Sequence, residues 1–120
     1  VQFGLAADPA VTQAWQPRTI RDEPVKASNK KGTVSFAKGG PNTRGMQLFI
    51  NLVDNGSKLD GQKFAPIGEI VEGMEVVEAL TGEYGAAPGN AQSAIVQGGN
   101  QFLNANYPNL DYITSARFTE

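Results

Sequence analysis

The chain has 120 residues, ten of them basic and twelve acidic, and its net charge of −2 without long runs of like charge argues against a surface that tracks nucleic-acid phosphates. It contains neither cysteine nor histidine, which excludes disulfides, thiolate nucleophiles and catalytic sites built on Ser–His–Asp or Cys–His. No segment approaches the roughly 18 consecutive apolar residues of a membrane span, and the length favours one domain over residues 1–120.

The first half of the chain predicts three short strands separated by irregular segments. Val1–Ala6 is typical of a strand that enters a loop, and Ala10–Trp15 fits a short turn of helix. Thr33–Ala37 alternates apolar and polar residues, whereas Gln47–Leu52 is rich in the branched and aromatic residues that favour strands. Trp15, the only tryptophan, is expected to cover one end of the core.

A strand followed by a helix is predicted next. Ile67–Val71 is expected to be the strand, and Glu72–Leu80 is the best helix candidate in the chain. The apolar residues Met74, Val77 and Leu80 fall on one face of that helix, and glutamates occupy another. The glutamate row is interpreted as a solvent-facing side rather than a cation site.

The last forty residues are expected to contain two more strands. Glu83–Asn90 is interpreted as a mobile loop because it contains two glycines and a proline. Ala94–Val96 and Tyr112–Phe118 are predicted to be the last two strands. Gly98–Leu110 would then be a long connection whose aromatic residues pin it to the body of the protein.

The segment Gly39–Gly45 is a shaped loop between two of the predicted strands. Glycine occupies three of its seven positions, which allows positive φ and close backbone approach, and Pro41 fixes one further φ. Taken alone, such a loop is more often a structural connection than a binding site.

Several short motifs accompany this loop in a fixed order along the chain. They are A-x-x-GPNT-x-x-x-Q-x-FI starting at Ala37, then Leu59–Gly61, Phe64–Gly68 and Val71–Val77, with Val1–Gly4 matching the end of an F-M-x-Q-x-G segment. Together they resemble a divergent branch of the cyclophilins, the peptidyl-prolyl cis–trans isomerases, over nearly the whole chain. The resemblance implies a mainly β fold, an antiparallel barrel capped by the helix Glu72–Leu80. This chain would represent roughly the C-terminal two-thirds of that domain, without its N-terminal strands and first helix.

The resemblance implies an activity that this composition permits. Turning an X–Pro bond crosses a barrier of about 20 kcal/mol because the amide must lose its resonance. The reaction needs no covalent intermediate, metal or cofactor. A catalyst has to hold the proline ring, fix the preceding carbonyl and stabilise the twisted amide.

Eight site residues follow from the resemblance, each at a position where a motif matches. They are Gln2, Ala37, Lys38, Gly39, Gln47, Phe49, Leu59 and Phe64. Gln2 corresponds to the family's glutamine that orients the catalytic side chains, and Gln47 to a second glutamine of the site. Phe49 and Leu59 match apolar walls of the proline pocket, although each alone would be interpreted as a core residue. Phe64 occupies the family's variable aromatic or histidine position.

Ala37–Gly39 match the rim segment that pairs with the bound peptide through its backbone. Lys38 stands where the family usually has asparagine, and Gly39 where it usually has alanine. Because the family's contacts there are made by the main chain, these departures bear on peptide preference more than on binding.

The family's catalytic arginine precedes the residue that matches Val1, as do the Phe and Met that complete the pocket. The arginines of this chain lie outside that motif: Arg18, Arg21, Arg44 and Arg117. We therefore expect the isolated chain to have an open barrel and impaired activity. The parent protein is expected to isomerise X–Pro bonds in proline-containing segments of client proteins.

Two other functions remain open at this stage. The first is a non-catalytic cyclophilin-like subunit that binds peptides or braces a larger assembly, with a complementing N-terminal segment as a further partner. The second is an unrelated β domain that binds sugars or nucleotides. The sequence leaves the compartment open, an organelle lumen or periplasm included, and implies no nucleic-acid partner.

Overall fold

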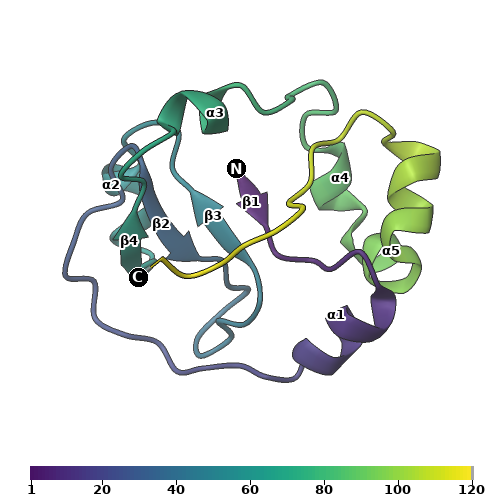
Figure 1. Ribbon diagram of the computed structural model, residues 1–120. Coiled ribbons are helices and arrows are strands. Elements are labelled where there is room, and N and C mark those ends of the chain that lie inside the picture. Colours follow the sequence, from purple (N-terminus) through teal and green to yellow (C-terminus); the bar gives the residue numbers. More distant parts are fainter. Residues whose placement is uncertain (120) are drawn as a thin grey trace.

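The computed structural model describes residues 1–119 and is organised around a four-stranded antiparallel sheet (Figure 1). The strands are β1 (Gln2–Phe3), β2 (Thr33–Phe36), β3 (Leu48–Ile50) and β4 (Pro66–Glu69), and their spatial order is β1-β3-β2-β4. All four overlap predicted strands, and every pair is antiparallel as predicted. The sheet formed by the described residues is open and does not close into a barrel.

The two faces of the sheet differ in chemistry. Phe49 lies opposite Gln2 on one side and Ser35 on the other, and residues opposite each other in antiparallel strands share a face, here called the groove face. The opposite, apolar face carries Phe3, Val34, Phe36, Leu48 and Ile50.

The apolar face is incompletely covered by residues 1–119. All five of its side chains are only half-buried. Among the described residues, the only buried hydrophobic side chains are Ala65 and Ile95. The sheet therefore lacks a packed layer on this side.

Besides the sheet, the described residues form five helices: α1 (Pro9–Trp15), α2 (Gly56–Leu59), α3 (Met74–Glu78), α4 (Ala87–Asn90) and α5 (Gln92–Asn106). Figure 1 shows α1, α4 and α5 grouped beside β1, with α2 on the β4 side. The predicted helices Ala10–Trp15 and Glu72–Leu80 are both present, the second shortened to α3. An ion pair between Lys31 and Glu78 connects α3 to the segment before β2. Within residues 1–119, no helix has the length and apolar character needed to cross a bilayer.

The prediction for residues 94–110 is wrong. Ala94–Val96 is not a strand but lies in α5, which also includes most of the predicted connection Gly98–Leu110. A short apolar triplet fits a buried helical turn as well as a strand, and here Ile95 is buried while α5 packs against α1. The predicted loop Glu83–Asn90 likewise contains the short helix α4.

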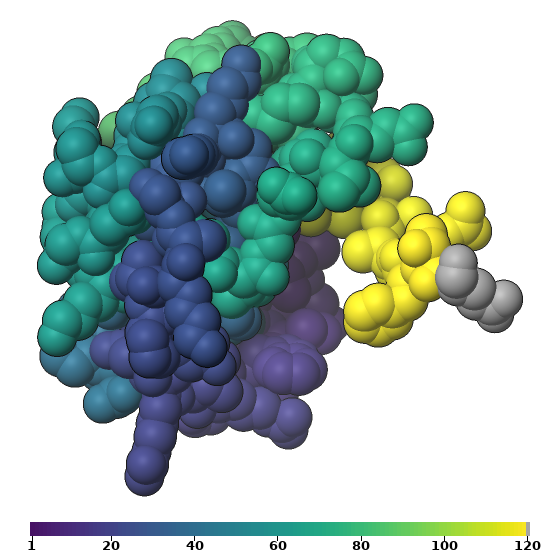
Figure 2. Space-filling model, turned by 90° about the vertical axis from the view of Figure 1, so that its left-hand side faces the viewer, coloured from purple at the N-terminus to yellow at the C-terminus, as the bar shows by residue number. Residues whose placement is uncertain are grey.

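Two other predictions also fail. Tyr112–Phe118 is an exposed segment that pairs with no strand among the described residues, and Figure 2 shows the yellow C-terminal segment standing out from the body of the molecule. A strand needs a partner for its backbone groups, and within residues 1–119 this segment has none. Trp15 is 51% exposed and does not cover a core, and its ring lies against the Arg18 guanidinium at 4.9 Å.

A close backbone contact holds α5 against the N-terminal segment. Gly99 interrupts the helix with φ 54° and ψ −141°, and the next amide, of Asn100, donates to the Ala7 carbonyl at 2.9 Å. A Cβ at Gly99 would lie 2.1 Å from that carbonyl oxygen and 2.8 Å from Pro9 Cδ. The contact therefore requires glycine for both backbone conformation and space.

Gly99→Ala is expected to lower the free energy of unfolding by about 1–3 kcal/mol, because alanine is strained at this φ and its methyl group would collide with the Ala7 carbonyl. Urea unfolding measures the change. Gly89→Ala is the matched control, since nothing lies within 4 Å of a Cβ there. Equal stability of the two variants would contradict the close contact at Gly99.

Candidate functional site

One cavity of about 610 Å³ contains all eight residues predicted for the site. They reach it from different parts of the chain: Gln2 from β1, Phe49 from β3, and the others from the loops and helix beside the groove face. We call this cavity the groove. The structure thus brings the predicted residues together, while their roles in catalysis stay a prediction.

An aromatic pair forms the apolar wall of the groove. The rings of Phe49 and Phe64 meet edge to face, with centroids 5.7 Å apart and an interplanar angle of 77°. Leu59, the last residue of α2, lines the same cavity. A flat ring beside branched aliphatic groups offers the kind of surface on which a pyrrolidine ring can pack.

The glycine-rich loop beside this wall is held by its own side chains. The Gly39 amide donates to Thr43 Oγ1 at 3.0 Å, and the Thr43 hydroxyl donates to the Gly40 carbonyl at 2.8 Å. Asn42 adopts a left-handed φ of 58°, and its Oδ1 accepts from the Asp22 amide at 2.9 Å. Hydrogen bonds therefore hold this loop in one conformation, in which it forms the rim of the groove.

Lys38 is packed into this rim. Its side chain is only 8% exposed, its Nζ lies 3.5 Å from Asp22 Oδ2, and the same ammonium group lies 5.4 Å from the centre of the Phe64 ring. Lys38 thereby supports the aromatic wall. The sequence pattern did not indicate this contact, because Asp22 lies in an irregular segment far from the motif.

Three side-chain amides form a chain of hydrogen bonds across the groove. Gln2 Nε2 donates to Gln47 Oε1 at 2.9 Å, and Gln47 Nε2 donates to Gln92 Oε1 at 3.2 Å. Gln92 begins α5 and was missed by sequence reasoning, as was Val96, which also lines the groove. No local pattern marks either residue as part of a site, because each reaches the groove through the packing of α5.

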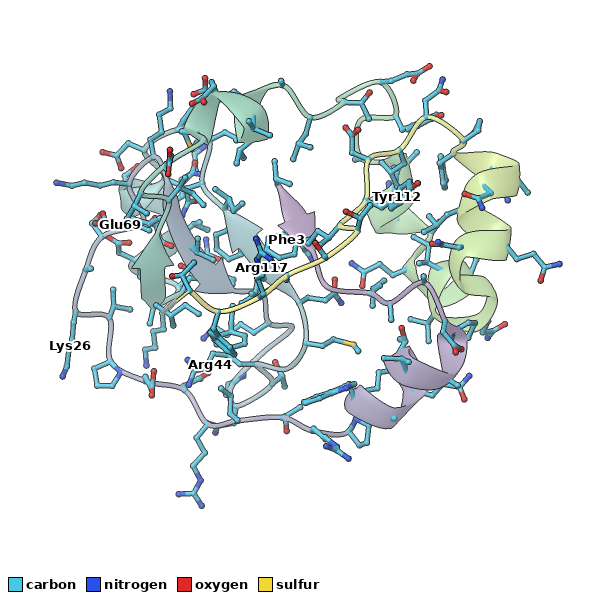
Figure 3. The ribbon with its side chains drawn as sticks, in the orientation of Figure 1. Phe3, Lys26, Arg44, Glu69, Tyr112 and Arg117 are labelled. Carbon is cyan, nitrogen blue, oxygen red and sulfur yellow. The ribbon has the colours of Figure 1, made fainter. Side chains whose placement is uncertain are left out.

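No arginine lines the groove among the described residues. Arg44 is 4% exposed and donates to the Arg21 carbonyl, lies 3.3 Å from Glu23 Oε2 and stacks 5.3 Å from the Phe36 ring. Figure 3 shows Arg44 below the strands and Arg117 on the C-terminal segment. Arg44 is therefore engaged in holding the segment before β2.

A cluster of buried polar side chains lies on the groove face around Asn29. Asn29 is fully buried; its Nδ2 donates to Asp60 Oδ1 at 2.7 Å and to the Phe64 carbonyl at 2.8 Å. Ser35 donates to Asn29 Oδ1 at 2.8 Å, and Asn51 donates to the same atom at 3.3 Å. The cluster thus connects β2 and β3 to the segment that carries Leu59 and Phe64.

The pKa of Asp60 is lowered by the hydrogen bonds that its carboxylate accepts. The Ser28 hydroxyl contributes most, followed by the side chain and then the backbone amide of Asn29. A carboxylate whose pKa is lower in the folded than in the unfolded state stabilises the fold above its unfolded pKa, and this contribution disappears as the pH falls through the folded pKa.

Asp60→Asn is therefore expected to destabilise the protein at pH 7. The difference should shrink as the pH falls below about 4, the ordinary pKa of an unfolded aspartate, and vanish once the pH has passed the lower pKa of the folded protein. Urea unfolding of both proteins at several pH values measures the difference. Asp54→Asn controls for the removal of a charge, because Asp54 Oδ1 accepts from the Gly56 amide at 2.9 Å and an asparagine oxygen can accept the same bond. A stability difference that grows toward low pH would contradict the assignment.

Comparison with known proteins identifies the family. The family model described as cyclophilin type peptidyl-prolyl cis-trans isomerase/CLD matches residues 2–97. Peptidyl-prolyl cis-trans isomerase B of Escherichia coli K12 is 31% identical over 87 residues, which cover 66% of this chain and 53% of the relative. The enzyme of the same name from Saccharomyces cerevisiae is 43% identical over 52 residues, or 43% of this chain and 25% of the relative.

These matches extend over about half and a quarter, respectively, of the relatives' own lengths. The family match nevertheless includes most of the chain, and all eight predicted site residues lie within it, with Gln2 at its first position. The chain belongs to the family of cyclophilin-type peptidyl-prolyl cis–trans isomerases.

Proposed function

We propose that the protein is a peptidyl-prolyl cis–trans isomerase that acts on proline-containing segments of other proteins. The observation that carries the proposal is the convergence of an aromatic wall, a shaped backbone rim and two glutamine amides on one groove. Membership of the cyclophilin-type family supports the same activity.

Each part of the groove has a task in this reaction. The proline ring packs on Phe49, Phe64 and Leu59, and the peptide backbone on its amino side pairs with the rim at Ala37–Gly39. Gln47 presents its amide to the peptide, and Gln2 orients neighbouring polar groups. Rate enhancement arises only where these contacts are stronger for the twisted amide than for either planar form.

The donor to the prolyl nitrogen is assigned to a residue outside the described groove lining. In the twisted state this nitrogen becomes pyramidal and accepts a hydrogen bond. We assign the donor to the arginine that the family places before the residue matching Val1. Two observations support this assignment: none of the described residues that line the groove is an arginine, and Arg44 is buried in other contacts.

The four-stranded sheet is proposed to be part of one cyclophilin barrel, with residues 1–120 forming a portion of a single domain. The half-buried apolar face supports this view, because a closed barrel would cover it. So does the extent of the match to the Escherichia coli relative, 53% of its length. A closed barrel would also leave no unpaired edge at β1 or β4.

The full-length protein is expected to accelerate cis-to-trans conversion of a proline peptide, and residues 1–120 alone are expected to show little activity. Loss of one preorganised donor typically costs on the order of 10²–10³ in rate. An isomerisation assay on both forms, with folding followed by circular dichroism, measures this. An inactive full-length protein that carries the arginine would favour the alternative, a peptide-binding subunit of a larger assembly.

Phe49→Ala is expected to weaken binding of a proline peptide, because it removes most of the apolar wall beside Phe64. Titration of the full-length protein with the peptide measures the change. Phe36→Ala is the matched control, since Phe36 is also half-buried but belongs to the apolar face. Similar losses of affinity in both variants would show that the effect comes from general destabilisation and would contradict the pocket.

A further inference from the structure

Gln92 is the member of the amide chain that connects the groove with α5. It lies 45 residues from Gln47 in the sequence, and its side chain is half-buried at the start of the helix. Gln92 and Val96 are four residues apart and both line the groove, so one face of α5 forms a wall of the cavity.

This wall is held in place independently of the groove. α5 packs against α1, and the contact at Gly99 and Asn100 attaches it to the Ala7 carbonyl. The N-terminal segment is itself anchored, because the Ala6 amide donates to the buried Thr12 hydroxyl of α1 at 2.9 Å. Gln92 therefore offers a hydrogen-bonding group of defined position.

With Gln2 and Gln92 oriented as they are, the hydrogen bonds set one orientation of the Gln47 amide. Its Oε1 accepts from Gln2 and its Nε2 donates to Gln92. A flipped Gln47 would set nitrogen against nitrogen at Gln2 and oxygen against oxygen at Gln92, losing both bonds. An amide nitrogen carries two N–H donors, and the bond to Gln92 uses only one of them.

We propose that Gln92 is a positioning residue, which fixes the Gln47 amide so that its second N–H donates to a carbonyl of the bound peptide. The inference rests on the proposed isomerase function for its ligand. It assigns to the start of α5 a part in substrate recognition that acts through Gln47 and not through direct contact with the reacting bond.

Three substitutions in the full-length protein separate this role from a structural one. Gln92→Met keeps the length of the side chain but removes the acceptor, Gln92→Glu keeps an acceptor, and Gln92→Lys offers only donors. Gln101→Met, the same change from glutamine to methionine at an exposed position of α5, serves as the matched control. Thermal unfolding of each variant measures stability separately.

Gln92→Met is expected to lower kcat/KM for a proline peptide roughly two- to tenfold, mainly through KM, which corresponds to the loss of one neutral hydrogen bond. Gln92→Glu, which keeps an acceptor for the Gln47 amide, should lose clearly less activity than Gln92→Met. Gln92→Lys should lose at least as much as Gln92→Met because it favours the flipped amide. Gln101→Met should behave as wild type.

The side-chain NH₂ signals of Gln47 in nuclear magnetic resonance spectra give a readout that does not need activity. They are expected to be dispersed in the wild type and Gln92→Glu, and to move toward solvent-exposed values in Gln92→Met. Unchanged Gln47 signals and kcat/KM in Gln92→Met, or equal behaviour of the Glu and Lys variants, would overturn the positioning role. A wild-type protein without isomerase activity would overturn the proposed function, and the Gln47 signals would still decide the positioning role.

Discussion

The hydrogen bonds between Asn29 and Asp60 are the constraint on which the groove depends. A buried amide and a carboxylate stabilise a fold only when their polar atoms are paired, and here Ser28, Ser35 and the Phe64 carbonyl complete the pairing. Because this cluster holds the segment after α2 against the sheet, Phe64 is placed beside Phe49. The apolar wall of the groove is thus positioned by polar contacts on the same face.

The sheet separates two kinds of surface by the alternation of its side chains. The groove face carries Ser35, which belongs to the polar cluster, and Gln2 and Phe49, which line the groove. The apolar face carries the side chains suited to the interior of a barrel, and these are half-buried. A single strand such as β3 therefore serves both surfaces, with Phe49 on one and Leu48 and Ile50 on the other.

Contacts between residues far apart in the sequence also hold the groove in place. Lys38 lies against Phe64 because Asp22 pairs with its ammonium group, and Gln47 is held between Gln2 and Gln92. The lysine at position 38, where the family usually has asparagine, thus adds a contact that supports the aromatic wall. The start of α5 similarly brings side chains to the groove that do not belong to any recognised motif.

By itself, the sequence determined the strands β2 and β3, the helix α3, the cyclophilin resemblance and the eight residues that meet in the groove, because alternation, helical periodicity and a motif around a glycine-rich loop are local features. The roles of those eight residues in catalysis remain a prediction. Only the tertiary structure decided that Ala94–Val96 belongs to a helix, that Tyr112–Phe118 has no strand partner among the described residues, and that Gln92 reaches Gln47. The physical reason is that these outcomes depend on what packs or pairs with each segment, and such partners lie tens of residues away in the chain.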